Sequence, residues 1–153
     1  MVFAGWKNLF VAGFLSLTIL FTIVEAHGAK WQFIGFTRYR DPLYLDLERT
    51  TILPNGVLSA WTRITPADNS LFRVQLRPEL HRAHKTAKDV KYLEMNKEIQ
   101  CTGNQIRHLK LIYYDHRDRV LAFSGNSKAP WKPILEGSLW PDLQKAVCRQ
   151  KNK

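Results

Sequence analysis

The sequence predicts an α+β fold, in which an antiparallel sheet of about six strands has one C-terminal helix packed on it. Three observations support this prediction. Between residues 30 and 124, short segments with strand-like alternation are separated by turn residues. One segment near the C-terminus instead has the apolar spacing of a helix. The chain also holds two cysteines, Cys101 and Cys148, one in each of these regions.

The first strands are predicted from the N-terminal part of this region. Residues 30–37 (KWQFIGFT) are rich in aromatic and β-branched side chains, which favours a strand. In residues 43–47, leucines alternate with Tyr and Asp in the period-2 pattern of a half-buried strand. Asn55-Gly56 is a turn signal because this pair adopts positive φ at low cost. We therefore expect a hairpin or meander that ends with a strand over residues 57–64.

The middle of the chain has a mixed pattern. Within residues 71–89, Phe72, Val74 and Leu76 alternate, but Pro78 interrupts the alternation and the remainder is basic and polar. We interpret this segment as a short strand followed by a loop or a short helical turn.

A second hairpin is predicted further along. Residues 90–101 and 106–114 are typical of strands, and residues 120–124 begin a return strand after a polar turn. Residues 125–133 are predicted as a loop. Alternation in the second of these strands places Leu109, Leu111 and Tyr113 on one face and His108, Lys110, Ile112 and Tyr114 on the other.

The C-terminal helix has clear start signals. Ser138 is a favourable N-cap residue, and Pro141 is tolerated in a first helical turn. The apolar residues that share one face of this helix, up to Cys148, are Leu139, Leu143, Ala146 and Val147.

The N-terminal segment predicts export. Residues 9–24 form the apolar run LFVAGFLSLTILFTIV, preceded by Lys7 and followed by small residues. This order is typical of a secretory signal peptide. We expect cleavage after Ala26, with Gly28 as the alternative position. A retained anchor is the other interpretation, but the 16 apolar residues fall short of the about 20 that a spanning helix needs.

The chain thus divides into a signal peptide, residues 1–26, and a single domain, residues 27–153. In an exported protein an even pair of cysteines is expected to form a disulfide. A bond between Cys101 and Cys148 would close a loop of about 47 residues and stabilise the domain by about 4 kcal/mol in the chain-entropy model. If Cys101 ends a strand, this bond ties the helix to the sheet.

The net charge indicates an anionic partner. The formal charge is +10, and loss of Lys7 and Glu25 with the signal peptide leaves it unchanged. A strongly basic exported domain attracts polyanions such as lipopolysaccharide, anionic phospholipid, acidic glycans or acidic protein surfaces. Nucleic acid is not an expected partner in this compartment, and membrane contact would be peripheral only. The alternative interpretation is that the charge serves solubility alone.

One segment concentrates this charge and is the candidate polyanion-binding site. Its cations are Arg73, Arg77, Arg82, Lys85, Lys88 and Lys91. A solvated helix or loop face is the alternative interpretation. His81 and His84 are spaced to share a metal on a helix, but no nearby Cys or carboxylate completes a ligand set, so we predict neither metal nor cofactor.

The sequence predicts no enzyme and no catalytic residue. It has no glycine-rich phosphate loop, no nucleophile elbow and no supported pair of catalytic carboxylates. Trp61, Trp131 and Trp140 could form exposed platforms for a glycan or protein. Packing in or beside the core is the favoured interpretation, because a small domain needs large aromatic side chains.

The order of these residues resembles the surface-adhesin E family of small exported bacterial domains. The matching segments are YLDLERTTILPNGVLSAWTRI from Tyr44, YLEMNKEIQC from Tyr92, IYYDHRDRVLAFS from Ile112, and WKPILEGSLWPDLQKAVC from Trp131. Trp31 and Ile34 match as well. The resemblance implies an antiparallel sheet of about six strands, a C-terminal helix and a Cys101–Cys148 disulfide. It carries over no catalytic residue, because the shared motifs are aromatic core residues, turns and the cystine.

Two functional hypotheses follow. The family is named for an adhesin that binds host extracellular-matrix and serum proteins, so the resemblance implies a non-catalytic exported binding domain that contacts host matrix proteins or polyanions. That adhesin is lipid-anchored, whereas this chain has no cysteine near the expected cleavage site. We therefore expect a periplasmic or secreted protein rather than a surface-anchored one. The alternative is a periplasmic accessory or structural envelope protein that binds a partner of its own cell.

Overall fold

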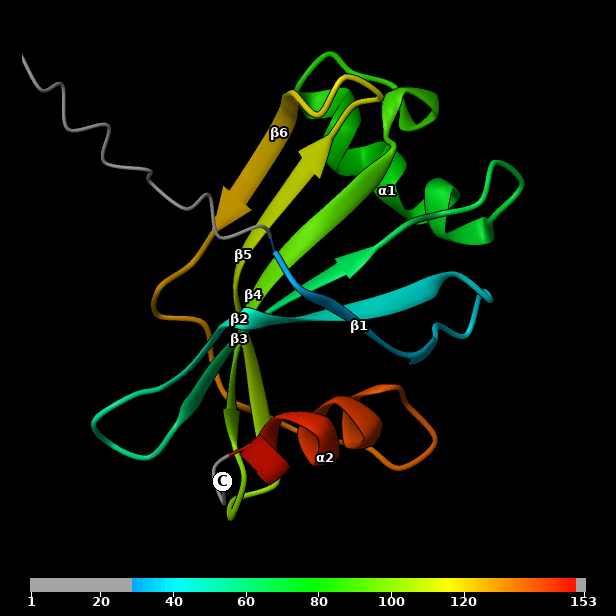
Figure 1. The fold of residues 1–153 in the computed structure, drawn as a ribbon. Coiled ribbons are helices and arrows are strands. Elements are labelled where there is room, and N and C mark those ends of the chain that lie inside the picture. The colour runs from blue at the N-terminus through cyan, green and yellow to red at the C-terminus, as the bar shows by residue number, and fades with distance from the viewer. Residues whose placement is uncertain (1–28, 151–153) are drawn as a thin grey trace, which may run out of the picture.

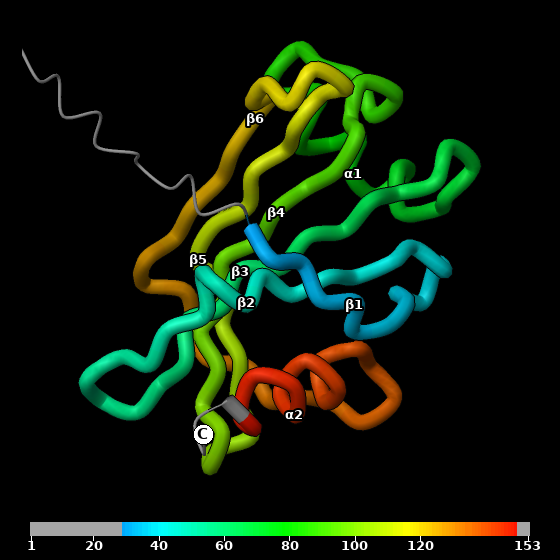
Figure 2. Tube along the Cα trace, viewed as in Figure 1, coloured from blue at the N-terminus to red at the C-terminus, as the bar shows by residue number. Residues whose placement is uncertain are grey.

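The domain is a single antiparallel sheet with two helices on one of its faces (Figure 1). The computed structural model describes residues 29–150, so the predicted signal peptide, residues 1–26, lies outside the described residues. In Figures 1 and 2 both helices lie on the same side of the sheet, α1 near one end of the strands and α2 near the other. Among residues 29–150, no helix is both long and apolar enough to cross a membrane.

Six strands follow one another across the sheet in chain order, and a two-residue seventh strand pairs with β5. The strands are β1 Trp31–Phe36, β2 Pro42–Ile52, β3 Leu58–Ile64, β4 Tyr92–Gln100, β5 Gln105–Tyr114, β6 Val120–Gly125 and β7 Lys132–Pro133. The helices are α1 Leu71–Arg82 and α2 Trp140–Gln150, with a short 3-10 helix η1 Ala87–Asp89. The predicted fold class is confirmed, and the short β7 lies in the segment predicted as a loop.

The core fills the space between one sheet face and the two helices. Every second residue of a strand points toward this face, which is why the period-2 patterns of β2 and β3 were informative. The cluster beneath α1 contains Leu43, Ile64, Leu76, Leu80, Val90, Leu93, Met95 and Tyr113. The cluster beneath α2 contains Leu45, Leu58, Ala60, Ile99, Ile106, Ile134, Leu143 and Val147.

For residues 71–89 the sequence predicts a short strand followed by a loop or a short helical turn. The strand is wrong, because α1 occupies residues 71–82, whereas η1 is a short helical turn at residues 87–89. The inward residues are Arg73, Leu76 and Leu80, which recur at helical spacing and are buried. Val74, whose alternation with its neighbours indicated a strand, is exposed. Two of the three inward positions are apolar and the third is an arginine, so the helical period was hard to detect.

A contact distant in sequence fixes where α1 begins. The hydroxyl oxygen of Ser70 accepts a hydrogen bond from the backbone N–H of Phe72 at 3.0 Å, as an N-cap does. The same hydroxyl donates to the buried carboxylate of Asp41 at 2.6 Å. Asp41 also accepts from the backbone N–H of Ala67 at 3.0 Å. This carboxylate at the start of β2 thus holds the loop that leads into α1.

The predicted alternation in β5 is wrong at one position. Between the register pairs Lys97–His108 and Asn96–Lys110, Leu109 is an extra residue and forms a β-bulge. The bulge places His108 on the helix-covered face next to Lys97, instead of on the face of Lys110 that strict alternation predicts.

The opposite face of the sheet carries a stack of alternating rings and guanidinium groups. Arg63 lies between the rings of Trp31 and Tyr92, at 4.1 and 4.0 Å from their centroids. Arg49 lies between Trp31 and Trp61, at 5.4 and 4.8 Å. We call these five residues the cation–π stack. It joins β1, β2, β3 and β4 on the face opposite the two helices.

Two buried carboxylates neutralise the cation–π stack. Glu94 accepts hydrogen bonds from Arg63 at 2.7 Å and from Arg49 at 3.1 Å. Asp46 accepts from the Nε of Arg49 at 2.5 Å and from the backbone N–H of Glu48 at 3.0 Å. Although burial opposes the charge of Arg49, its hydrogen bonds to Asp46 and Glu94 raise its pKa above the usual value.

The disulfide prediction is confirmed, and the bond joins the end of β4 to α2. Cys101 and Cys148 are bonded, with their Cα atoms 5.9 Å apart. Gln144 donates a further hydrogen bond from α2 to the carbonyl oxygen of Cys101 at 3.2 Å. On the same helix Leu143 and Val147 are fully buried, so α2 is attached to the sheet both covalently and by apolar packing.

We predict that replacing both cysteines with serine lowers the free energy of unfolding by about 4 kcal/mol, because the loop that the bond closes regains its entropy in the unfolded chain. Urea denaturation of wild type and of C101S/C148S measures this difference. Wild type treated with reductant should unfold at the same lower urea concentration as the variant. Equal midpoints for oxidised wild type and the variant would contradict the prediction.

We predict that W31A lowers the free energy of unfolding by about 2 kcal/mol, because Trp31 contacts both guanidinium groups of the cation–π stack. The control is W131A, since Trp131 contacts a single guanidinium, that of Arg107 at 4.5 Å. Denaturant melts of the two variants compare the losses. A loss at W131A as large as that at W31A would show that the stack adds nothing beyond one ring–cation contact.

Candidate functional site

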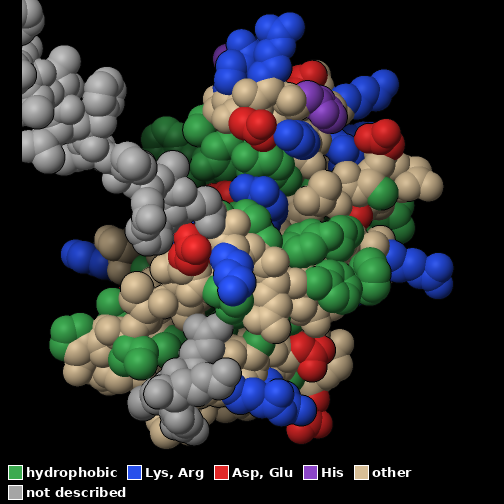
Figure 3. Space-filling model, viewed as in Figure 1, with side chains coloured by type: hydrophobic (Ala, Val, Ile, Leu, Met, Phe, Trp, Pro, Cys, Tyr) green, Lys and Arg blue, Asp and Glu red, His purple; other side chains and the backbone are tan. Residues whose placement is uncertain are grey.

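Basic side chains gather at the end of the molecule that holds α1 and η1. Figure 3 shows Lys, Arg and His side chains over this end, with fewer acidic ones among them. The structure separates the six cations of the predicted polyanion site into three groups. One cation is internal, three line a groove with exposed side chains, and two lie elsewhere.

Arg73 is the internal cation, and it holds the segments around α1 together. Its guanidinium donates to the carbonyl oxygens of Pro66 and Ala67 at 2.9 Å each, and to those of Ala87 and Val90 at 2.6 and 2.7 Å. It is 8% exposed. A guanidinium with four backbone acceptors is a structural group, so Arg73 is not available to an external anion.

Four of the predicted cations line an open groove beside α1 with a volume of about 660 Å³, and the internal Arg73 is one of them. Its apolar part is formed by Leu71 and Val74, which are 65% and 47% exposed. Its exposed basic side chains are Arg77, His81, Lys85 and Lys88. We call these four residues, together with Leu71 and Val74, the α1 groove. The carboxylate of Asp68 also lines it and pairs with Arg73 at 3.3 Å. Helical spacing brings Leu71, Val74, Arg77 and His81 to one side of α1, and the following turn adds the two lysines.

The remaining two predicted cations lie elsewhere. Arg82 lines a different pocket together with Glu79 and Tyr113. In that pocket, burial and then the carboxylate of Glu79 raise the pKa of the Tyr113 hydroxyl, which donates a hydrogen bond to Glu79. Lys91 forms an ion pair with Asp118 at 3.0 Å. The predicted set is therefore not one continuous surface.

The predicted histidine pair does not assemble into a ligand set. His81 lies on α1, whereas His84 follows the helix in a left-handed conformation with φ of 54°. In the part of the chain that the structure describes, no group of three or more His, Cys, Asp or Glu side chains is placed to hold a metal ion.

The three tryptophans considered as platforms are half-buried and each contacts a cation. Trp61 belongs to the cation–π stack, Trp131 lies beside Arg107, and Trp140 lies beside Lys97. These contacts agree with the packing interpretation. The sequence did not indicate which arginine or lysine each ring would meet, because every one of these pairs joins residues that are distant in sequence or lie on different elements of the fold.

Sequence reasoning missed a buried lysine on the helix-covered face. Lys97 is fully buried, and its Nζ lies 2.9 Å from His108 Nδ1, 3.2 Å from Met95 Sδ and 4.2 Å from the ring centroid of Trp140. Its position in β4, between the inward Met95 and Ile99, was the available signal. A lysine at an inward strand position is rare unless it has partners.

The surroundings of Lys97 disfavour positive charge. Burial holds the pKa of Lys97 well below its usual value. Desolvation, followed by the charges of Lys97 and Lys132, lowers the pKa of His108 to about 3. His108 is therefore neutral at physiological pH, and its Nδ1 can accept a hydrogen bond from the amine of Lys97.

We predict that His108 makes the domain less stable in acid. Its pKa is about 3 when folded, against 6.5 as the ordinary value. Between these values the unfolded chain binds the additional proton, so the free energy of unfolding falls as pH falls from about 6.5 to about 3. Denaturant melts at about pH 7.5 and about pH 4.5 should show a smaller decrease for H108Q than for wild type. The control is H116Q, in the β5–β6 turn. An unchanged decrease in H108Q would contradict the prediction.

Structural comparison finds crystal structures of Haemophilus influenzae protein E. One has a TM-score of 0.50 and 11% sequence identity, and the match covers 77% of this chain and 84% of that chain. Crystal form II of the same protein has a TM-score of 0.49 and 8% identity, covering 79% and 90%. At this level of identity, the first match supports the fold alone. No curated protein sequence matches the chain significantly.

A match to a protein-family model shows to which family the chain belongs. The family model described as surface-adhesin protein E matches residues 55–149, which is more than half of the chain. The matched range begins in the β2–β3 turn and ends in α2, so it includes the α1 groove and both cysteines. The chain belongs to the surface-adhesin protein E family.

Proposed function

We propose that this protein is a non-catalytic exported binding domain that contacts an anionic macromolecule through the α1 groove. One observation carries the proposal. Arg77, Lys85 and Lys88 line a single open groove, and among the described residues none of the three forms an ion pair. Exposed cations without internal partners are available for an external anion.

The chemistry of the α1 groove favours a partner with both charge and apolar surface. The cations lie beside Leu71 and Val74, so an anionic group can meet them while an apolar part covers the two aliphatic side chains. The formal charge of +10 adds long-range attraction. Host matrix proteins with acidic segments, acidic glycans and lipopolysaccharide have this chemistry, and membership of the adhesin family supports such a role.

Export is part of the proposal. The apolar run at residues 9–24 and the disulfide between Cys101 and Cys148 both fit an oxidising compartment outside the cytoplasm. We place the protein in the periplasm or the medium. Release by osmotic shock identifies the periplasmic pool, and protease accessibility on whole cells identifies any surface pool.

We predict that R77A/K85A/K88A weakens binding to immobilised heparin and to lipopolysaccharide by about tenfold or more. The matched control, K30A/K110A/K128A, removes the same number of charges from exposed positions outside the groove and should weaken binding by less than about twofold. Surface plasmon resonance measures the affinity of wild type and of both triple variants. The same three proteins, tested against immobilised matrix proteins, address the host partners.

Equal losses in the two triple variants would overturn the groove assignment, since net charge alone would then account for binding. Absence of binding by wild type to every one of these ligands would overturn the proposed function. Circular dichroism of each variant confirms that the comparison is made between folded proteins.

A further inference from the structure

The outer face of α1 carries an apolar stripe that the core does not use. Its residues Leu71, Val74 and Pro78 are exposed and follow one line along the helix, because they recur at helical spacing. The buried Leu76 and Leu80 lie on the opposite side of α1. A helix that packs on a sheet normally has a polar outer face. The stripe is therefore apolar surface that has no role in packing this domain.

Cations border this stripe. Arg77 and Arg82 lie one on each side of it along α1, and Lys85 and Lys88 follow the end of the helix. All four side chains are exposed, and among the described residues none of them forms an ion pair. They belong to the end of the molecule where basic side chains gather in Figure 3.

The carboxylates close to these cations in sequence have partners inside the domain. Between residues 66 and 91 the acidic residues are Asp68, Glu79 and Asp89. Asp68 pairs with the internal Arg73 at 3.3 Å, and Glu79 accepts a hydrogen bond from Tyr113. Asp89 accepts from the hydroxyl of Thr86 at 2.7 Å. The four cations beside the stripe are thus left to an external anion.

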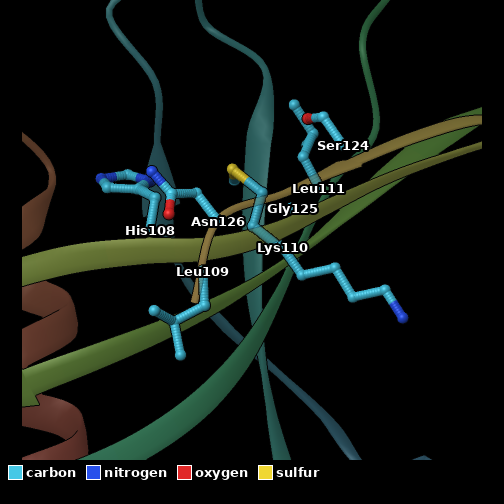
Figure 4. Close-up of a pocket in the computed structure, with 8 residues that line it drawn as sticks. His108, Leu109, Lys110, Leu111, Ser124, Gly125 and Asn126 are labelled. Atoms are coloured by element: carbon cyan, nitrogen blue, oxygen red, sulfur yellow. The ribbon is translucent and has the colours of Figure 1, made fainter. Parts of the chain in front are cut away.

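The pocket at the β5 bulge does not combine these two kinds of surface. It has a volume of about 240 Å³, and Met95 and Leu111 supply apolar surface to it. Among its lining residues the one Lys or Arg is Lys110, whose side chain leads away from His108 and Asn126 in Figure 4. Exposed apolar side chains and available cations adjoin on α1, and not in this pocket.

An anionic lipid bilayer supplies both partners that the outer face of α1 needs. Heparin and other acidic glycans offer charge but little apolar surface, so they would leave the stripe exposed to water. At a bilayer surface, aliphatic side chains enter the boundary between headgroups and acyl chains while flanking cations meet the lipid phosphates. Because the stripe and its cations lie on the outward side of one helix and its following turn, a flat surface can reach all of them together.

We propose that α1 docks on anionic lipid bilayers with its axis along the membrane surface. The stripe enters the interface, and the four cations contact lipid phosphates. This inference rests on the proposed function, since three of the four cations are those of the α1 groove, and it names a lipid surface as their partner. Binding of this kind is peripheral and reversible, because its strength depends on a small apolar area and on charge attraction.

The test is cosedimentation of the purified exported protein with vesicles. One set contains equal parts of phosphatidylcholine and phosphatidylglycerol, and the other contains phosphatidylcholine alone. We expect wild type to bind the mixed vesicles at least about tenfold more tightly than the neutral ones. L71Q/V74Q exchanges the aliphatic side chains for polar ones that still favour a helix, and it should bind the mixed vesicles about tenfold more weakly than wild type.

The matched control is I52Q/L135Q. It removes two aliphatic side chains of similar exposure from the end of β2 and from the loop before α2. Its affinity for the mixed vesicles should stay within about twofold of wild type. The proposal is overturned by wild-type affinity in L71Q/V74Q, by an equal loss in I52Q/L135Q, or by equal binding of wild type to the two kinds of vesicle.

Heparin binding separates this inference from the proposed function. L71Q/V74Q keeps every cation, so its affinity for heparin should stay within about twofold of wild type. Wild type that binds heparin or lipopolysaccharide but not the mixed vesicles would overturn the lipid assignment and leave the proposed function standing. A loss of matrix-protein binding in L71Q/V74Q, with vesicle binding unchanged, would assign the stripe to a protein partner and overturn the lipid assignment as well.

Discussion

A sheet covered by helices on only one face is the constraint on which the rest of this structure depends. Two short helices are enough to cover that face, and they leave the other face exposed to water. The cation–π stack lies on the open face, across the first four strands. Guanidinium groups between rings, neutralised by Asp46 and Glu94, hold four strands together without an apolar second layer. The fold thus uses two different kinds of packing on its two faces.

In this arrangement the basic residues fall into two groups with different roles. Arg49, Arg63 and Arg73 are bound to rings, carboxylates or carbonyl oxygens and contribute to the fold. Arg77 and the two lysines of the α1 groove have no such partners among the described residues and remain available to a ligand. A high net charge by itself did not distinguish these groups. The distinction depends on which cations meet an acceptor elsewhere in the fold.

Patterns of period two predicted most of the sheet, because its strands have one buried and one solvent-facing side. The C-terminal helix was predicted from the spacing of its apolar residues, and the cystine from the even number of cysteines. The failures have physical causes. α1 has an arginine at an inward position and begins at a serine held by Asp41, and neither fact can be read from neighbouring residues. The β5 bulge depends on pairing with β4, so the contact of His108 with Lys97 was not predictable from alternation.

The cystine has a mechanical consequence for a protein of an adhesin family. A pulling force applied beyond residue 148 would pass through the sulfur atoms to Cys101, at the end of β4. The chain between the two cysteines, which includes β5, β6, β7 and most of α2, would lie outside the path of tension. Under load the shortest covalent route therefore runs from the first four strands directly to the C-terminal end of the domain. Half of the cluster beneath α2, namely Ile106, Ile134, Leu143 and Val147, would be spared from direct extension, as would most of α2 itself.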